Sequence, residues 1–313
     1  MQRPDLVWVT TLAASHAARN GLDTSRPAFY ALGGTDGLRA VAAGDAQAVL
    51  AWRPGAGWEA ALPADHSSRH LLELYLPMCA ARTGHPVTVG HIGQSLDGYI
   101  ATQAGESRFV TGQQNIFHLH RLRALADAVV VGARTVAADD PRLTTRLVPG
   151  ANPLRVVLDP RRRLAAHHRL FTDGEAPTLL VCEARRAACG PDRVGDAEVI
   201  GVPSAAGGLD LSALLDVLHR RGCHAVFVEG GGVTVSGFLE AGLLDRLQVT
   251  VAPLLIGDGR PGVRLPPTSS LNDCLRLRHR IFRMGDDILF DCDLRSPRPT
   301  VLPPDDATLA RVL

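Results

Sequence analysis

Short apolar runs, each bounded by turn residues, recur along the chain from residue 128 onward. The runs are AVVVG (128–132), LRVVLD (154–159), TLLVCE (178–183), AEVIGVP (197–203) and HAVFVEG (224–230). They are rich in β-branched residues and hardly alternate with polar ones, which is typical of parallel strands buried on both faces. Between the last two runs, a helix near 211–221 would place Leu211, Leu214, Leu215 and Leu218 on one face. The pattern predicts an α/β fold with a mostly parallel sheet.

The segment 87–126 predicts two strands followed by a helix. VTVGHIGQSLDGYIAT (87–102) is expected to form a hairpin that turns at Asp97 and Gly98, because Asp-Gly is a strong hairpin signal. A helix should begin after Thr111, whose hydroxyl would cap the first turn. The apolar stripe of this helix would consist of Ile116, Leu119, Leu122 and Ala126.

Two further elements are expected towards the C-terminus. QVTVAPLLIG (248–257) predicts a strand at an edge or with a bulge, because Pro253 has no N–H to donate to a ladder. RLRHRIFRMGDDILFDCDL (276–294) predicts a hairpin that turns at Gly285 and Asp286. Residues 296–313 contain four prolines and predict a loosely attached tail.

Residues 1–86 differ from the rest and predict a small α+β domain of unknown role. This part holds the short apolar runs LVWVT and AVLAW, and a helix is expected from about Ser68. Pro77 should kink or end that helix. No catalytic signature occurs here, and the domain could serve interaction or dimerisation. The predicted division is therefore 1–86, 87–295 and a tail over 296–313.

The bulk composition excludes several classes of function. The formal net charge is +1, which argues against nucleic acid as a principal partner. No apolar run approaches the ~20 residues of a membrane span, and the N-terminus lacks an export signal, so we expect a cytoplasmic location. The six cysteines include no C-x-x-C pair, so no metal site is expected from them.

The chain contains no lysine, so all its basic side chains other than histidine are arginines. This excludes Schiff-base chemistry on a lysine and the lysine-bearing P-loop. Any phosphate must be bound by arginine, hydroxyl and backbone N–H groups.

Three glycines follow the run 224–228, after Glu229 and before a predicted helix that contains Thr234 and Ser236. A strand, a glycine loop and a helix N-terminus together present N–H groups to an anion. The spacing departs from the G-x-G-x-x-G pattern of dinucleotide-binding folds, and a tight turn alone would also explain the glycines.

Four segments in this order change that balance. They are GQSLDGYIATQAGESRFVTG, HRLRALADAVVVGARTVAADDPRLTTR, PLRVVLDPRRRL and VFVEGGGVTVSGFLEAGLLDRLQVTVAPLLIG. Together they closely resemble the reductase domain of the bacterial riboflavin biosynthesis deaminase–reductase family, over roughly residues 87–294. The resemblance implies a dihydrofolate-reductase-like fold, a mixed and mostly parallel sheet flanked by helices. It also implies a homodimer that uses NADPH to reduce the ribosyl group of a phosphoribosylaminopyrimidine to ribityl.

The resemblance implies a set of cofactor contacts. They are Gly93, Phe109, Thr135, Asp139, Gly231, Gly232, Val233, Thr234, Val235, Ser236 and Gly237. Arg161, the first of three arginines after the run 154–159, is our candidate for the adenosine 2′-phosphate. The alternative for these arginines is a solvated run of charge.

The implied substrate contacts are Ser107, Arg123, Leu143, Arg146 and Glu229. Arg123, Arg146 and Ser107 would bind the substrate 5′-phosphate, since arginine forks suit phosphate geometry. Glu229 would accept hydrogen bonds from the substrate and orient it. Without the resemblance, either arginine could equally be a solvated surface residue, and Glu229 could bond to its own loop.

The chain departs from the family pattern at several places. Residues 1–86 lack the H-x-E and P-C-x-x-C motifs of the zinc deaminase, so that metal site cannot be built. His91 stands where many members have lysine, either as a substrate contact or as a packed strand residue. Pro160 stands where serine is common, and the hydroxyl of Thr234 is displaced by one position.

The leading hypothesis is an NADPH-dependent reductase of a 5-amino-6-(5-phosphoribosylamino)uracil-like pyrimidine, as in riboflavin synthesis. A second hypothesis keeps the fold and cofactor but takes a pteridine or specialised-metabolite intermediate. A third is a non-catalytic ligand-binding or regulatory protein on the same fold.

Overall fold

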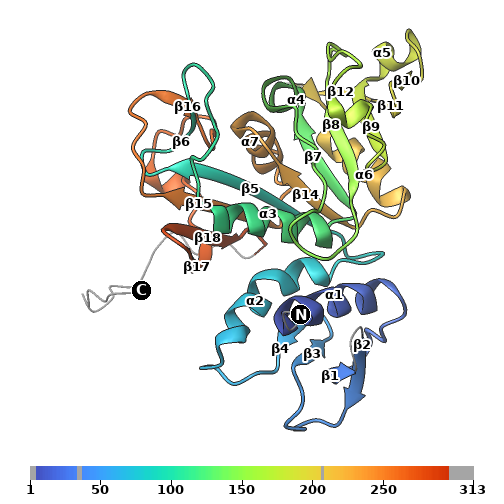
Figure 1. The fold of residues 1–313 in the computed structure, drawn as a ribbon, viewed down its shortest axis with the longest axis vertical. Helices are drawn as coiled ribbons and strands as arrows, with labels where there is room; N and C mark the ends of the chain where they lie inside the picture. Colours follow the sequence, from blue (N-terminus) through green and yellow to red (C-terminus); the bar gives the residue numbers. More distant parts are fainter. Residues whose placement is uncertain (1–4, 34–36, 206–207, 296–313) are drawn as a thin grey trace.

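A mixed sheet of ten strands forms the larger part of the structure, a computed structural model that describes residues 5–33, 37–205 and 208–295 (Figure 1). The strand order is β10 (Arg193–Val194), β11 (Ala197–Val202), β9 (Thr178–Glu183), β8 (Leu154–Leu158), β7 (Ala128–Gly132), β14 (Ala225–Glu229), β5 (Val87–Ser95), β15 (Arg246–Ala252), β18 (Asp287–Asp293) and β17 (Arg278–Met284). From β11 to β15 all neighbours are parallel, whereas β10 and the β17–β18 hairpin are antiparallel. The predicted mostly parallel sheet is confirmed.

Helices cover both faces of this sheet. They are α3 (Gln113–Leu125), α4 (Ala133–Asp139), α5 (Ala184–Ala188), α6 (Leu211–Arg220) and α7 (Gly232–Glu240), with short 3-10 turns η1 (Arg169–Phe171) and η2 (Leu271–Asp273). Alternate residues of β7 enter different cores, since Val129 and Val131 pack with Leu122 of α3, and Val130 packs with Phe238 of α7. Burial on both faces explains why these strands read as continuous apolar runs.

Residues 5–79 form a separate four-stranded antiparallel sheet with two helices. Its elements are α1 (Leu6–Arg19), β1 (Ala28–Gly33), β2 (Gly37–Val41), β3 (Leu50–Arg53), β4 (Gly57–Ala60) and α2 (Ser67–Cys79), with strand order β2-β1-β3-β4. In Figure 1, α1 and α2 lie between this small sheet and the large one. Trp8 and Tyr75 share one hydrophobic core with Val87 and Leu122, so the two parts are packed together. Helix α2 continues two residues beyond Pro77.

The predicted hairpin at Asp97 and Gly98 is wrong. The chain does turn there, but β6 (Tyr99–Thr102) pairs with β16 (Gly259–Pro261) rather than with β5. Both edges of β5 are already paired, with β14 and with β15. No ladder of β5 remains for β6, and the turn therefore leads the chain out of the sheet.

Two other expectations are corrected by the same sheet. Strand β15 is not at an edge, because it lies between β5 and β18. It ends at Ala252, so Pro253 follows the strand and removes no ladder bond. Strands β12 (Ser204–Ala205) and β13 (Gly208–Leu209) form a further small pair.

The N-terminus of α3 is capped differently from the prediction. Gly112 is the N-cap residue and no side chain caps the helix, while Thr111 Oγ1 accepts a bond from Asn115 Nδ2 at 2.9 Å. The backbone N–H of Gly112 instead donates to Asp287 Oδ2 at 2.6 Å. The expected apolar stripe is also incomplete, since Ile116 is exposed and polar residues occupy much of the buried face.

No helix among residues 5–33, 37–205 and 208–295 is long and apolar enough to cross a membrane. The proline-rich segment 296–313 lies outside the described residues.

Candidate active site

The predicted cofactor residues gather where the parallel strands end. Helix α4 follows β7 and carries Thr135 and Asp139, and α7 follows β14 and carries most of the glycine loop. Arg161 follows β8, and Gly93 lies two residues before the end of β5. Since parallel strands bring their carboxyl ends to one edge, these groups lie along the edge at which α/β sheets generally bind ligands.

Two of the three glycines 230–232, which follow β14, are required by the backbone. Gly230 has φ of 124°, in a region that residues with a side chain rarely adopt. A Cβ on Gly232 would lie 2.6 Å from the carbonyl oxygen of Pro261 and closer still to that of Gly262. Gly231 is different, because its φ is −59° and a Cβ there would have Thr135 Oγ1 as its nearest neighbour, at 3.3 Å.

Helix α7 begins without a side-chain cap. The N–H of Gly231, its N-cap residue, donates to Thr135 Oγ1 at 3.2 Å. No described residue accepts a bond from the N–H of Gly232 or Val233, and Val233 is 71% exposed. Gly232 is buried, so the exposed Val233 marks the accessible side of this helix N-terminus, whose unused N–H groups fit a phosphate of a dinucleotide.

Other residues of the predicted loop have packing roles. Val235 is fully buried, and Ser236 Oγ accepts a bond from the N–H of Arg264 at 2.8 Å. The hydroxyl of Thr234 lies against Gly132, where a Cβ would be 2.5 Å away. Gly237 faces Leu211, 3.5 Å from an added Cβ.

The remaining predicted cofactor residues lie at the surface or near it. Phe109 is 86% exposed with φ of 66°, an uncommon backbone conformation for a bulky residue. A Cβ on Gly93 would approach Thr111 to 2.9 Å. Arg161 is exposed, whereas the guanidinium of Arg162 donates to the carbonyl oxygens of Arg186 and Pro191.

Ser107 and Asp139 lie together, although the sequence assigned them to opposite halves of the site. Ser107 Oγ donates to Asp139 Oδ1 at 3.4 Å. The loop before α3 and the end of α4 therefore meet here.

The two predicted phosphate-binding arginines converge on Thr144. Arg123 is buried, and its Nη1 donates to the carbonyl oxygen of Thr144 at 3.3 Å. Arg146 Nη1 donates to Thr144 Oγ1 at 2.7 Å and lies 3.5 Å from the same carbonyl oxygen. Partial burial and, next, the charge of Arg123 lower the pKa of Arg146. Two guanidinium groups held side by side are suited to an anion.

Glu229 lies against this pair at the end of β14. Its carboxylate accepts bonds from Nε and Nη2 of Arg123, the first at 2.8 Å. The side chains are 9% and 14% exposed, so the ion pair is largely buried. The structure thus brings together Arg123, Arg146 and Glu229, while Leu143, buried with φ of 54°, shapes the loop that leads to Thr144.

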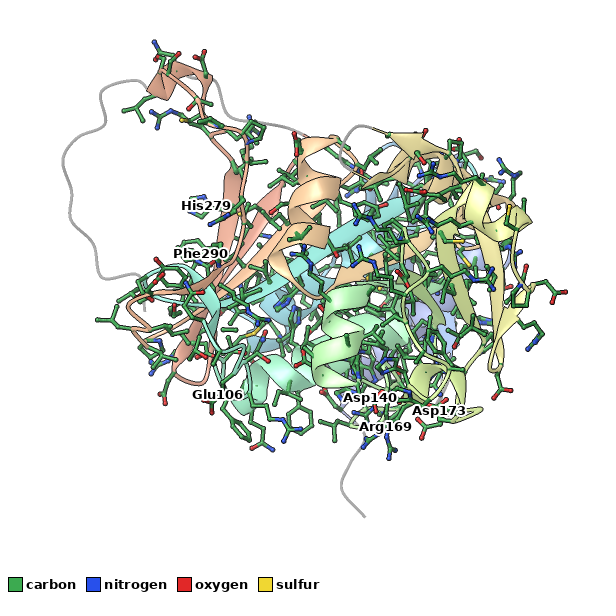
Figure 2. The ribbon with its side chains drawn as sticks, turned by 90° about the horizontal axis from the view of Figure 1, so that it is seen from above. Glu106, Asp140, Arg169, Asp173, His279 and Phe290 are labelled. Atoms are coloured by element: carbon green, nitrogen blue, oxygen red, sulfur yellow. The ribbon has the colours of Figure 1, made fainter. Side chains whose placement is uncertain are left out.

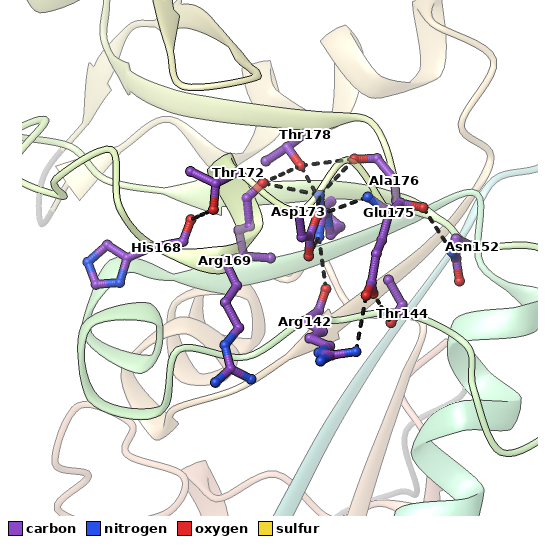
Figure 3. Close-up of polar contacts among 12 residues, drawn as sticks. Arg142, Thr144, Asn152, His168, Arg169, Thr172, Asp173, Glu175, Ala176 and Thr178 are labelled. Carbon is purple, nitrogen blue, oxygen red and sulfur yellow. Dashed lines mark hydrogen bonds and ion pairs between the residues drawn. The ribbon is translucent and has the colours of Figure 1, made fainter.

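A buried arginine, Arg155, anchors that loop, and Figure 3 shows its neighbours Arg142, Asp173 and Thr178. Arg155, 1% exposed, donates to both carboxylate oxygens of Asp173 at 2.8 Å. Arg155 also donates to the carbonyl oxygens of Arg142, Leu170 and Ala176 and to Thr178 Oγ1. Glu175 then accepts bonds from Arg142 and from Thr144 Oγ1, at 3.1 and 3.2 Å. The segment that carries Thr144 is thereby bound to the loop 169–178.

The same loops are joined once more at Asp140. Its carboxylate accepts the N–H of Arg169 at 2.9 Å and pairs with the Arg169 guanidinium at 3.2 Å. Figure 2 shows Asp140, Arg169 and Asp173 close together, away from His279 and Phe290 of the β17–β18 hairpin. The hairpin and these loops therefore lie at different parts of the molecule.

His120 also belongs to this region, and the sequence analysis missed it. Its Nδ1 accepts the backbone N–H of Arg146 at 3.0 Å. Burial and, next, the charges of Arg123 and Arg146 lower the pKa of His120 to about 4. The available signal was its position three residues before Arg123, on the same face of the predicted helix.

A row of polar side chains crosses the sheet beneath α3. In register on adjacent strands stand Glu229, His91, Gln248, Asp291 and Arg280. His91 is 3% exposed and its Nε2 bonds to Asn115 Oδ1 and Thr250 Oγ1, at 3.0 and 3.1 Å. Burial lowers the pKa of His91 to about 4. His91 is therefore a packed, neutral strand histidine.

The row reaches the N-terminal part of the chain through His118 of α3. Its Nε2 donates to Gln248 Oε1 at 2.8 Å, and its Nδ1 accepts the hydroxyl proton of Tyr75 at 2.9 Å. Gln248 Nε2 in turn donates to Asp291 Oδ1 at 3.3 Å. Burial and, next, the neighbouring His91 lower the pKa of His118 to about 3. Helix α2 is thus bonded to the helix that carries Arg123.

Within the described residues, no group of three or more His, Cys, Asp and Glu side chains could hold a metal ion.

Residues 87–290 match the model of a protein family described as the RibD C-terminal domain. The match begins one residue after the N-terminal part predicted from the sequence.

Curated relatives share this region. The chain is 36% identical over 217 residues to the 2,5-diamino-6-ribosylamino-4(3H)-pyrimidinone 5′-phosphate reductase of Methanothermobacter thermautotrophicus, covering 66% of this chain and 97% of that protein. It is 33% identical over 223 residues to the riboflavin biosynthesis protein RibD of Escherichia coli, covering 66% of this chain and 59% of RibD. The chain thus spans nearly all of the archaeal reductase but little more than half of the bacterial protein.

Solved structures show the same fold. RibD of Acinetobacter baumannii superposes with a TM-score of 0.59 at 26% identity, over 74% of this chain and 62% of that one. The deaminase/5-amino-6-(5-phosphoribosylamino)uracil reductase of Thermotoga maritima gives 0.57 at 25% identity, over 72% and 60%. The dihydrofolate-reductase-like fold is confirmed.

Proposed function

Because the chain belongs to the family of the RibD C-terminal domain, we propose that it is an NADPH-dependent reductase of riboflavin biosynthesis. Its substrate would be a 5-amino-6-(5-phosphoribosylamino)uracil-like pyrimidine, whose ribosyl group it converts to ribityl. The observation that carries this proposal is the convergence of Arg123 and Arg146 on Thr144, beside the carboxyl ends of the parallel strands.

The arginine pair favours a phosphorylated substrate. Two guanidinium groups held close together repel each other, and a dianionic phosphate between them would relieve that repulsion while accepting several charge-assisted bonds. An unphosphorylated pteridine would leave this pair without an anion. The pair therefore supports a phosphoribosyl compound over the pteridine alternative.

The dinucleotide would lie along the start of α7 and along α4. The unused N–H groups of Gly232 and Val233 would bind a phosphate, with Thr135 and Asp139 beside them. Ser107, bonded to Asp139, stays a predicted contact of the substrate 5′-phosphate. Arg161 would meet the adenosine 2′-phosphate at the surface after β8. When bound, NADPH would supply a hydride to the opened ribosylamine, which with one proton becomes the ribitylamine.

The chain's own residues would supply orientation rather than a nucleophile. Arg123 and Arg146 would hold the 5′-phosphate, and Glu229, fixed by Arg123, would accept a bond from the substrate. Holding the reacting atoms in the right orientation accounts for much of the rate acceleration in hydride transfer. Each group acts by position, which agrees with the rigid loops behind Thr144.

Further expectations about location, assembly and domains belong to this proposal. The enzyme would work in the cytoplasm, as a homodimer, and without nucleic acid or membrane partners. Residues 1–86 would be a separate domain and 296–313 a tail. The mass in solution tests the dimer directly.

Product analysis tests the reaction class and the cofactor together. Purified protein would be offered the deaminated phosphoribosylaminopyrimidine with NADPH, and in parallel with NADH. The proposal expects a product two hydrogens heavier by mass spectrometry, formed faster with NADPH. Absence of that product with either cofactor would contradict it and favour a non-catalytic binding protein.

A further inference from the structure

We propose that His120 is a positioning residue of the phosphate site, which fixes Arg146 relative to Arg123. The contact that does so is the hydrogen bond from the backbone N–H of Arg146 to His120 Nδ1, at 3.0 Å. This inference rests on the proposed function, because it assigns the two arginines to a substrate phosphate.

Through this contact, helix α3 fixes the positions of both arginines. His120 and Arg123 lie three residues apart on α3, so they face the same side of the helix. Both are buried, with 3% and 7% exposure. Arg146 belongs instead to the loop after α4, and its own side chain is exposed. The bond at His120 therefore links the backbone of Arg146, in the loop, to the helix that carries the buried Arg123.

The second anchor of Arg146 is local and would not replace this bond. Arg146 Nη1 bonds to Thr144, only two residues away in the same loop. That contact shapes the side chain but moves with the loop. Only the bond at His120 Nδ1 ties the backbone of Arg146 to another element among the described residues.

The ring must be neutral for this role. Nδ1 can accept only when it carries no proton, so the proton of the neutral ring lies on Nε2. Protonation would replace the acceptor by a donor facing another N–H, and would add a third positive charge beside Arg123 and Arg146. Burial and those two charges oppose protonation, and Glu229, whose charge favours it, is already paired with Arg123. The groups around His120 thus keep its Nδ1 unprotonated and able to accept the N–H of Arg146.

Three substitutions separate positioning from packing. His120→Asn places an amide oxygen where Nδ1 stands and keeps the acceptor. His120→Gln carries its amide one bond farther along the chain and removes the acceptor from that place. His120→Ala removes the whole ring. Asn and Gln are both polar and smaller than histidine, so they form a matched pair.

Binding of ribose 5-phosphate, measured by calorimetry with ribose as the unphosphorylated control, reports on the site without turnover. We expect His120→Gln and His120→Ala to weaken ribose 5-phosphate binding by roughly 10-fold, the value of one hydrogen bond of about 1.4 kcal/mol. His120→Asn should recover most of the affinity. KM for NADPH should change less than twofold in the variants that fold, because the contact is confined to the phosphate site.

Equal affinity in His120→Gln and His120→Asn would overturn the positioning role, as would a parallel loss of NADPH binding, which indicates general disorder. If His120→Ala fails to fold, the comparison of the Asn and Gln variants still decides. Failure of the wild-type protein to bind ribose 5-phosphate would instead contradict the proposed substrate, a result distinct from failure of the His120 contact.

Discussion

Arg123 and Glu229 hold each other through two adjacent N–H groups, with Nε 2.8 Å from Glu229 Oε2. This pairing uses one edge of the guanidinium and directs the remaining Nη1 towards Thr144 and Arg146. A buried pair of this kind is costly to break, because the partner left behind keeps an uncompensated charge. Glu229 therefore fixes the position of Arg123, in addition to its proposed contact with the substrate.

Arg123→Lys should lower kcat/KM for the phosphorylated substrate by about 10- to 100-fold. Lysine offers a point charge and cannot form the two adjacent bonds to Glu229 while also reaching Thr144. Steady-state kinetics measures this, with Arg278→Lys on exposed β17 as the matched control. A kcat/KM equal to that of the control would refute the role of the guanidinium geometry.

The glycines between β14 and α7 should respond differently to alanine. Gly231→Ala should fold, because its backbone suits any residue, and should raise KM for NADPH by about 10-fold by filling space at the start of α7. Gly232→Ala should instead lose about 1–3 kcal/mol of unfolding free energy through contact with Pro261 and Gly262. Thermal melts and NADPH titrations distinguish the two effects. An unchanged KM for NADPH in Gly231→Ala would exclude the loop from the cofactor site.

Arg161→Ala should reduce the preference for NADPH over NADH. Arg161 is exposed after β8, and it differs from Arg162, whose guanidinium already bonds to two carbonyl oxygens. Loss of a charge-assisted bond to the 2′-phosphate would raise KM for NADPH by roughly 10-fold and leave KM for NADH nearly constant. Equal changes for both cofactors would rule out this assignment.

Tyr75→Phe should lower the free energy of unfolding by about 1–3 kcal/mol. The change removes one hydroxyl and leaves His118 Nδ1 as a buried acceptor without its partner. Tyr30→Phe is the control, because no described residue bonds to that hydroxyl. Urea unfolding measures the difference, and equal stability of the two variants would show that this bond does not join α2 to α3.

Stability should fall as the pH drops from 7 towards 5. Burial lowers the pKa of His91 to about 4 and that of His118 to about 3, from an ordinary 6.5. Below pH 6.5 these two rings therefore bind protons in the unfolded chain but not in the folded protein. Each ring then lowers the free energy of unfolding by up to about 1.4 kcal/mol per pH unit. The stability from these rings is present above pH 6.5 and is lost on acidification. Urea unfolding at several pH values should show a smaller slope for His118→Gln, and an unchanged slope would contradict the buried neutral ring.

The parallel strands were predictable because burial on both faces leaves a direct signature, as in the runs 128–132 and 224–230. The pairing of β6 was not, since the Asp97–Gly98 turn is a local signal and the occupied edges of β5 are a property of the whole sheet. The expectation drawn from Pro253 was wrong for the same reason. A proline removes a ladder bond only inside a strand, and β15 ends before Pro253.

The site was predictable where a residue type and a family position coincide. Arg123, Arg146 and Glu229 do gather as expected, although their roles towards substrate and cofactor stay predictions. The contacts of His120 and Tyr75 have no sequence motif, because they are with a loop N–H and with a second histidine; for His120 only its position on the same helix face as Arg123 gave a signal. The polar residues on the buried face of α3 could not be predicted either, because they pack against the row of polar side chains on the strands beneath this helix.

The proposed binding of the substrate 5′-phosphate by Arg123 and Arg146 is most directly tested by comparing kcat/KM for the phosphoribosylaminopyrimidine with and without its 5′-phosphate. The reaction is followed as oxidation of NADPH. We expect turnover of the phosphorylated compound. For the unphosphorylated compound we expect a kcat/KM at least about 100-fold lower, because it loses two arginine contacts of about 1.5 kcal/mol each. Equal values for the two compounds, or no NADPH oxidation with either, would contradict it.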